Sequence, residues 1–300
     1  MDDLRRMALF AEVVRHGSMS AAARSQGLST SAVSQQMRAL EQGSGVTLLH
    51  RSTRKLTLTD AGLRFAEHCR AMVEAAEQAR RQLALAHDAP VGELRIAAPV
   101  GFARYVAPAL APLVADHPAL SLRLLVDDAM IDLIDARIDL ALRAGRLPDS
   151  THVARRLCIF DVILCAAPAY LRRHGTPQSP SDLLAHQWIM LSREGTALSF
   201  EMRRGEREHE SLRLEARVTS NNQFSVQQMA GAGLGIALLT RADVDEDLRS
   251  GRLVQLMPDW QVPGIAVWVV TPKRDNQPAK VRHAVGALAA HLAQVVGAST

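Results

Sequence analysis

The sequence predicts a two-part protein: an all-helical N-terminal region that carries a winged helix-turn-helix and a long helix, followed by a larger α/β region. Three observations support this fold class. Two short helical patterns near the N-terminus meet at a glycine, and one unbroken helical pattern follows them. Beyond a Pro/Gly break, short apolar runs alternate with helical patterns. A chain of 300 residues with 48% hydrophobic residues is long enough for two cores.

The first element is a pair of short helices between residues 17 and 41. Ser18 and Ser29 each precede a helical run, as N-cap residues do, and Gly27 breaks the chain between the runs. In the second helix three apolar residues recur with a spacing of four and three and predict a buried stripe: Val33, Met37 and Leu40. The pattern predicts a helix-turn-helix, and an αα-hairpin with a solvated outer face is the alternative.

The other face of the second helix carries side chains that donate and accept hydrogen bonds. Such a face is typical of a helix that contacts base edges in a major groove. The candidate DNA-contacting residues of this helix and its cap are Ser29, Thr30, Ser31, Ser34, Gln35 and Arg38.

The charge distribution favours the nucleic-acid interpretation over the hairpin. Residues 1–86 contain twelve Lys or Arg and eight Asp or Glu, whereas residues 87–300 balance 23 basic against 23 acidic side chains. The net charge of +4 therefore belongs to the helix-turn-helix end, where a polyanion would bind.

A short hairpin is predicted directly after the second helix. Apolar residues on either side of a polar, cationic tip, from Leu48 to Leu58, predict two short strands. Arg51, Arg54 and Lys55 would lie beside the recognition helix and contact phosphates or a minor groove, as in a DNA-binding wing. A solvated charged loop is the alternative.

A long helix is predicted from residue 61 to 86, with Thr59 as its cap. Apolar residues at heptad spacing form a seam along it: Phe65, Cys69, Met72, Ala76, Ala79, Leu83 and Ala86. A helix this long seldom finds enough of its own chain to cover it, so we expect a homodimer through this seam. The alternative is that the seam packs on its own chain.

These segments resemble the LysR-type transcriptional regulators. The resemblance rests on Ser20-Ala-Ala-Ala-Arg24, Ser31-Ala-Val-Ser-Gln-Gln36, Arg38-Ala-Leu-Glu41 and Leu58-Thr-Asp-Ala-Gly62, and it continues through Ile138-Asp-Leu-Ala-Leu-Arg143, Ala167-Pro-Ala-Tyr-Leu171 and Gly231-Ala-Gly-Leu-Gly-Ile236. It implies a sequence-specific transcriptional regulator that binds double-stranded DNA and whose promoter binding is modulated by a small-molecule effector. It also implies assembly into a dimer or tetramer, contact with RNA polymerase and no cofactor besides the effector.

The domain boundary is expected at the Pro/Gly break between His87 and Gly92. We therefore expect a winged helix-turn-helix domain over 1–60, a linker and dimerisation helix over 61–89, and a regulatory domain over 90–300. Its first lobe would comprise about 90–161 and 268–300, and its second lobe about 162–267.

Apolar runs and helical patterns alternate in the regulatory domain and predict a mainly parallel α/β sheet. In the first lobe we expect strands at Leu94–Ala98, Leu120–Val126 and Leu140–Arg143, and helices near 103–115 and 130–136. A similar unit follows from about 162 to 267, and Ala266–Thr271 with a helix over 278–295 returns to the first lobe. The family resemblance implies a ligand cleft between the lobes, as in type 2 periplasmic binding proteins.

Ligands of such sheets bind at the carboxyl ends of the strands. The candidate effector-binding residues are Pro99, Val100, Gly101, Phe102, Asp127, Arg143, Leu191, Asn222 and Gln223. Arg143 would hold an anionic effector or pair with a carboxylate such as Asp139. Asn222 would either contact the effector or cap the helix over 223–230, whose N-terminus also attracts anions. Many family members bind small carboxylates, so an organic anion is favoured.

Enzyme motifs do not appear. The chain contains no HExxH, GxSxG or P-loop spacing, and its three cysteines lack metal-ligand spacing. We therefore expect no catalytic residue and no metal site. Cys158 and Cys165 would form a redox pair if they flank a hairpin turn, as in one branch of the family, and buried structural thiols are the alternative.

The N-terminus is charged and amphipathic, and no apolar run reaches transmembrane length. We expect a cytoplasmic bacterial protein at the nucleoid. A solute-binding transport component would fit residues 90–300 alone, but it disagrees with the basic N-terminal region and with the absence of a recognisable signal peptide. Retention on heparin, reversed by salt, would separate the DNA-binding protein from a transporter or an enzyme.

Overall fold

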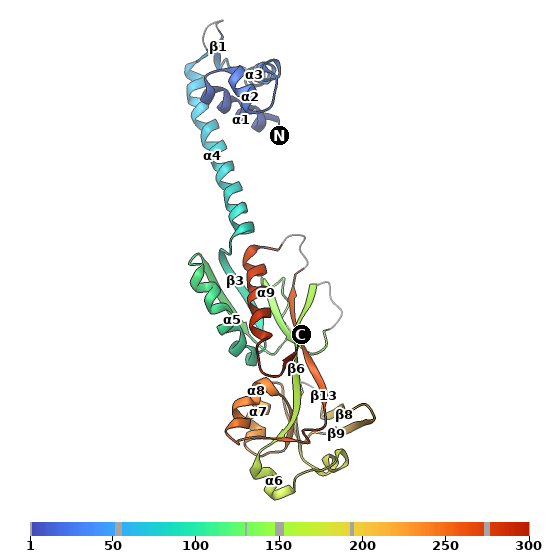
Figure 1. The fold of residues 1–300 in the computed structure, drawn as a ribbon. Helices are drawn as coiled ribbons and strands as arrows, with labels where there is room; N and C mark the ends of the chain where they lie inside the picture. Colours follow the sequence, from blue (N-terminus) through green and yellow to red (C-terminus); the bar gives the residue numbers. More distant parts are fainter. Residues whose placement is uncertain are drawn as a thin grey trace. The chain divides into compact units, whose positions relative to one another are not determined.

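The structure is a computed structural model that describes residues 2–51, 56–129, 131–147, 153–192, 195–272 and 277–299. The chain forms two compact units, Met1–Leu85 and Ala86–Thr300 (Figure 1). Among the described helices, none has both the length and the apolar character needed to cross a membrane.

The N-terminal unit is a helical domain with one small hairpin. Its elements are α1 (Asp2–His16), α2 (Met19–Ser25), α3 (Thr30–Ser44), β1 (Leu49–Arg51), β2 (Leu56–Leu58) and α4 (Asp60–Asp88), which extends into the second unit. Helices α1, α2, α3 and the start of α4 share one core that includes Phe10, Ala22 and Met37.

The local signals of the helix-turn-helix are confirmed. The Ser18 hydroxyl accepts a hydrogen bond from the backbone N–H of Ala21, and the Ser29 hydroxyl accepts one from Ala32. Gly27 follows the C-cap of α2 with a φ of +63°, in the left-handed region that glycine adopts without strain. The stripe of Val33, Met37 and Leu40 is buried.

The predicted hairpin is also present. β1 and β2 pair antiparallel, with Leu49 opposite Leu58. Glu41 fixes the entry into this hairpin, because its carboxylate accepts hydrogen bonds from the backbone N–H groups of Leu48 and Leu49 at 2.9 and 3.0 Å. A Cβ added at Gly62 would lie 2.1 Å from the carbonyl oxygen of Leu48, so only glycine allows α4 to pass this close.

The second unit contains two α/β lobes joined by long strands. Its strands are β3 (Gly92–Ala98), β4 (Leu120–Val126), β5 (Leu140–Ala144), β6 (Val153–Ala166), β7 (Trp188–Leu191), β8 (Ala197–Arg204), β9 (Glu208–Glu215), β10 (Val218–Ser220), β11 (Ile236–Thr240), β12 (Val254–Leu256), β13 (Val262–Thr271) and β14 (Ala298–Ser299). Its helices are η1 (Val100–Phe102), α5 (Ala103–Asp116), α6 (Pro168–His174), η2 (Pro180–Ala185), α7 (Gln223–Gly231), α8 (Arg241–Arg249) and α9 (Ala279–Leu292).

Within the described residues the main sheet has the strand order β10-β7-β11-β6-β13-β5-β3-β4, with β12 and β14 also paired to β6. Strands β3, β4 and β5 are parallel in one lobe, and β10, β7 and β11 are parallel in the other. The long strands β6 and β13 run side by side from lobe to lobe in opposite directions (Figure 1).

The sheet is therefore mixed rather than mainly parallel. The chain enters the second lobe along β6 and returns along β13, so the two crossing strands run antiparallel.

The prediction of a helix near 130–136 is wrong. Turns occupy the described residues there, and the Asp132 carboxylate accepts hydrogen bonds from the backbone N–H groups of Ile134 and Asp135. Such a local bond satisfies the backbone without a helix and competes with helix formation.

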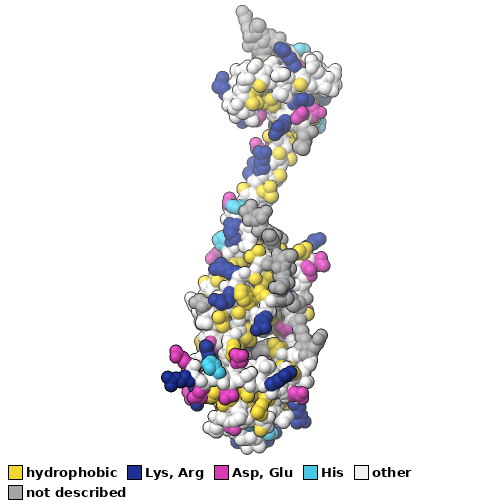
Figure 2. Space-filling model, turned by 90° about the vertical axis from the view of Figure 1, so that its right-hand side faces the viewer, with side chains coloured by type: hydrophobic (Ala, Val, Ile, Leu, Met, Phe, Trp, Pro, Cys, Tyr) yellow, Lys and Arg dark blue, Asp and Glu magenta, His cyan; other side chains and the backbone are white. Residues whose placement is uncertain are grey.

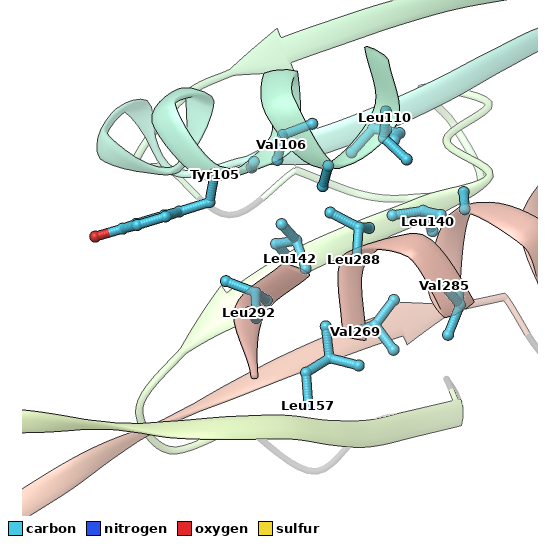
Figure 3. Packing of buried hydrophobic residues seen from close by; sticks show 14 of the residues in the cluster. Tyr105, Val106, Leu110, Leu140, Leu142, Leu157, Val269, Val285, Leu288 and Leu292 are labelled. Carbon is cyan, nitrogen blue, oxygen red and sulfur yellow. The ribbon is translucent and has the colours of Figure 1, made fainter. Parts of the chain in front are cut away.

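The core of the first lobe lies between the sheet and the helices α5 and α9. Figure 3 shows Val106 and Leu110 of α5 and Leu288 of α9 pointing toward Leu140 and Leu142 of β5. The hydroxyl of Tyr105, in contrast, points away from this cluster.

Candidate functional site

The polar face of α3 is accessible in the N-terminal unit. Ser29, Thr30, Ser31, Gln35 and Arg38 are exposed, and Ser34 is half-buried. The buried stripe fixes the rotation of the helix, because Val33, Met37 and Leu40 occupy the shared core. The candidate DNA-contacting residues of α3 therefore lie together on an open surface.

Two contacts hold the first turn and the middle of α3. The Ser29 and Ser31 hydroxyls lie 3.0 Å apart beside the helix N-terminus, and the Arg6 guanidinium of α1 donates a hydrogen bond to the Gln36 side chain at 3.2 Å. The candidate wing residues Arg54 and Lys55, and the side chain of Arg51, lie outside the described part of the chain.

The heptad seam of α4 divides into two parts. Phe65 and Cys69 contact the core of the N-terminal unit, and Cys69 is buried there. Ala76, Ala79 and Leu83 are exposed, and Leu83 is 73% exposed. Figure 2 shows hydrophobic side chains at the surface along this part of α4. The seam therefore packs on its own chain at Phe65 and Cys69, whereas Ala76, Ala79 and Leu83 are left exposed.

A cavity of about 480 Å³ lies between the two lobes of the second unit. Its lining residues come from the ends of several parallel strands: Pro99 after β3, Asp128 after β4, Arg146 after β5, Ser192 after β7 and Asn221 after β10. This is the position at which open α/β sheets hold ligands.

The cavity brings together most of the candidate effector-binding residues. Those that line it are Pro99, Gly101, Phe102, Arg143, Leu191 and Gln223, whereas Val100, Asp127 and Asn222 do not. The carboxylate of Asp127 is used in a local turn, where it accepts a hydrogen bond from the backbone N–H of Ala129 at 2.7 Å. Its neighbour Asp128 lines the cavity instead.

Arg143 does not pair with Asp139. Its guanidinium donates a hydrogen bond to the carbonyl oxygen of Ile131 at 3.3 Å. Asp139, the expected partner, forms an ion pair with Lys280 at 2.5 Å and accepts a hydrogen bond from the backbone N–H of Arg95. Arg143 is therefore held at the cavity wall by a backbone carbonyl rather than by Asp139.

Asn222 caps α7 and also connects the lobes. Its side-chain oxygen accepts a hydrogen bond from the backbone N–H of Ser225 at 2.9 Å, and its side-chain nitrogen donates one to Asp128 at 2.5 Å. Asp128 belongs to the first lobe, where its other carboxylate oxygen accepts a hydrogen bond from the backbone N–H of Val100. The capping alternative is thus the observed one, and the same side chain spans the cleft.

A second connection between the lobes lies at Asp243 of α8. Its carboxylate accepts hydrogen bonds from the Tyr105 hydroxyl at 2.7 Å and from the Thr240 hydroxyl at 2.5 Å. The Arg104 guanidinium donates to its backbone oxygen at 3.1 Å. Burial, reinforced by the nearby Asp243 carboxylate, raises the pKa of Tyr105, so its hydroxyl stays a donor at neutral pH. Tyr105 and Arg104 are on α5, so these bonds also cross the cleft.

Several lining residues were missed by the sequence analysis. Arg104, Phe224, Gln227 and Asp243 lie on the helices α5, α7 and α8 rather than in the loops at the strand ends. Asp128 and Arg146 do follow the rule that ligands bind at the carboxyl ends of strands, since they lie in loops after strands that the sequence predicts. The helical residues required knowledge of how α5, α7 and α8 meet.

The cysteines are buried thiols. Cys158 and Cys165 lie on the same strand, β6, and not on either side of a hairpin turn, so about 23 Å of extended chain separates them. Burial raises the pKa of Cys158 to about 11 and that of Cys165 to about 12. These two residues do not form a redox pair. Among the described residues, no group of three or more potential metal ligands occurs.

Comparisons with known proteins match both units. Residues 4–63 match the model of the bacterial regulatory helix-turn-helix proteins of the lysR family, and residues 87–293 match the LysR substrate binding domain.

Curated relatives extend along the full chain. The HTH-type transcriptional activator AaeR of Escherichia coli is 33% identical over 296 residues, which is 98% of this chain and 96% of that protein. The HTH-type transcriptional regulator DmlR of Escherichia coli is 34% identical over 295 residues, which is 98% of this chain and 95% of that protein.

A solved full-length structure has the same fold. The virulence activator AphB of Vibrio cholerae, a member of the LTTR protein family, superimposes with a TM-score of 0.69 at 26% identity, covering 96% of this chain and 99% of that one. The expectation of a regulator rather than an enzyme is confirmed by these matches. The chain belongs to the LysR family of transcriptional regulators, with a DNA-binding helix-turn-helix and an effector-binding domain.

Proposed function

We propose that this regulator binds DNA in a sequence-specific manner through the exposed face of α3, and that a small organic anion in the cleft cavity modulates its binding to promoters. The observation that carries the first statement is the accessible polar face of α3, with Ser34, Gln35 and Arg38 held on one side by a buried stripe. The second statement is supported by the arginines in the wall of the cavity.

The functional form is proposed to be a homodimer, or a tetramer of paired dimers, joined through α4. The exposed part of the seam, with Ala76, Ala79 and Leu83, supports this assembly. The small alanine side chains permit close approach of a second helix, and a dimer presents two recognition helices to two half-sites.

Effector binding changes the assembly only through its differential affinity for two states of the protein, typically worth about 1–3 kcal/mol. We place this difference at the hydrogen bonds that cross the cleft, from Tyr105 to Asp243 and from Asn222 to Asp128, because a ligand that moved the lobes apart would break them.

The test of DNA readout compares two duplexes. One is selected from a random pool by the wild-type protein, and the other is a scrambled duplex of the same composition. Replacing Gln35 or Arg38 with Ala should cost about 1–3 kcal/mol on the selected duplex and little on the scrambled one. Arg54→Ala, in the wing that the sequence predicts, should weaken binding to both duplexes alike and reduce the salt dependence.

Arg70→Ala is the matched control, because Arg70 is an exposed arginine of α4 whose partner is Glu74. This variant should keep the wild-type ratio between the affinities for the selected and the scrambled duplex. If Gln35→Ala and Arg38→Ala also kept that ratio, α3 would not be the element that reads the sequence.

A further inference from the structure

Two large apolar side chains in the wall of the cavity are left half exposed. Leu191, at the end of β7, is 51% exposed, and Phe224, in the first turn of α7, is 48% exposed. The wall also contains apolar side chains from other elements, including Phe102, Leu147 and Ile265. A ligand that removes this surface from water gains hydrophobic free energy that a small polar acid does not gain.

The charged side chains of the wall favour a ligand with a single negative charge. Among the described residues of the wall, Arg104, Arg143 and Arg146 stand against Asp128 and Asp243, a net charge of +1. Arg104 and Asp243 are already in contact, because the Arg104 guanidinium lies 3.7 Å from the Asp243 carboxylate. Arg146 is exposed and makes no polar contact with another described residue. Its guanidinium is therefore available to a ligand carboxylate.

On the basis of the proposed function, we infer that the effector is an amphipathic monoanion with one carboxylate beside Arg146 and a ring-sized apolar body against Leu191 and Phe224. A cavity of about 480 Å³ is within the range of small-molecule sites and has room for two fused rings. Dicarboxylates and amino acids bind more weakly here, because their second charged group would lose water against a wall whose described residues are largely apolar.

The probes are three compounds, titrated into the full-length protein by calorimetry. 2-Naphthoate has the apolar body and the carboxylate, 2-naphthalenemethanol has the same body without the charge, and succinate has two carboxylates and no apolar body. We expect 2-naphthoate to bind at least about tenfold more tightly than either of the others, since each lacks one of the two contacts.

Two variants locate the contacts, each with a matched control. Leu191→Ser should weaken 2-naphthoate binding about tenfold. Leu234→Ser removes a leucine that is 47% exposed in the same lobe but lies outside the cavity, and should leave the affinity unchanged. Arg146→Gln should weaken 2-naphthoate binding about tenfold and bring it toward that of the alcohol, while Arg213→Gln, on the exposed side of β9, should have no effect.

Tighter binding of succinate, absence of 2-naphthoate binding, or equal effects of the Leu191 and Leu234 variants would each overturn the inference. A band-shift assay with the selected duplex separates this result from the proposed function. If 2-naphthoate binds as expected without changing DNA affinity, the ligand class holds and the proposed modulation fails. If succinate changes DNA affinity instead, the modulation holds and the ligand class is wrong.

Discussion

The recognition surface on α3 and the cavity in the second unit are built in opposite ways. The candidate recognition residues lie on consecutive turns of one helix, between Ser29 and Arg38, and a single buried stripe orients them. The cavity takes its wall from helices and strand ends spread between Pro99 and Val270. A surface made by one helix depends on the rotation of that helix, whereas a cavity made by many segments depends on how two lobes close.

The two sites differ in the number of copies of the chain that we expect each to need. One α3 offers a single polar face, and the proposed dimer would place a second copy of that face on the DNA. The cavity is complete within one chain, because both lobes of its wall belong to the same unit. Breaking the dimer, unfolding the N-terminal unit and loosening the lobes should therefore give three separable phenotypes.

The largest effect is expected from Ala76→Glu. A charged side chain in the exposed part of the α4 seam should separate the dimer, and sedimentation would show a monomer. DNA affinity should then fall by about 10²–10⁴-fold, because the two half-sites no longer bind as a linked pair. Ligand affinity of the cavity should not change.

Ala71→Glu is the matched control, since Ala71 is also exposed but lies about 120° around α4 from the seam. It should leave the protein dimeric. An unchanged oligomer in Ala76→Glu would show that this stretch of the helix does not face a second copy.

A smaller effect is expected from Gly62→Ala, which tests whether the two units are independent. The added methyl group would overlap the Leu48 carbonyl, so the start of α4 and the hairpin must shift, at a cost of about 1–3 kcal/mol to the N-terminal unit. Thermal unfolding followed by circular dichroism should show an earlier first transition, with the transition of the second unit unchanged.

Gly43→Ala is expected to have the opposite effect on the stability of the N-terminal unit. Gly43 lies inside α3, and a Cβ there meets nothing within 4 Å. Alanine should therefore stabilise the same unit by about 0.5–1 kcal/mol. If both glycine variants destabilised the unit equally, close packing at Gly62 would not be the cause.

The smallest effect is expected from Tyr105→Phe, which removes one hydrogen bond across the cleft. The Asp243 carboxylate would lose a donor at 2.7 Å, at a cost of about 1–2 kcal/mol. We expect a lower transition temperature for the second unit and weaker ligand binding, because the closed arrangement of the lobes becomes less stable.

Tyr170→Phe is the control, because Tyr170 is the other tyrosine of the chain and lies in the second lobe, where its hydroxyl accepts a hydrogen bond from the backbone N–H of Gln187. It should lower the stability of the same unit without changing ligand affinity. Equal loss of ligand affinity in both variants would assign the effect of Tyr105 to stability alone.

The sequence by itself determined the helix-turn-helix and the short hairpin of the N-terminal unit, although the first helix, α1, was not among the predicted elements. The caps at Ser18 and Ser29, the glycine after α2, the buried stripe of α3 and the hairpin are local signals, and each acts within a few residues. Four strands of the second unit, β3, β4, β5 and β13, were also predicted, since short apolar runs identify them. The turn around Asp132 was not, because the side chain of that one residue satisfies the local backbone in place of a helix.

Only the tertiary structure decided how the seam of α4 is divided and which residues form the cavity. Heptad spacing is the same at Cys69 and at Leu83, yet one is buried against the N-terminal core and the other is exposed. In the same way Asp127 and Asp128 are neighbours in sequence, and Asp128 alone reaches the cleft and accepts a hydrogen bond from Asn222 of the other lobe. Periodicity specifies the face of an element, but contacts between segments far apart in the chain determine what that face meets.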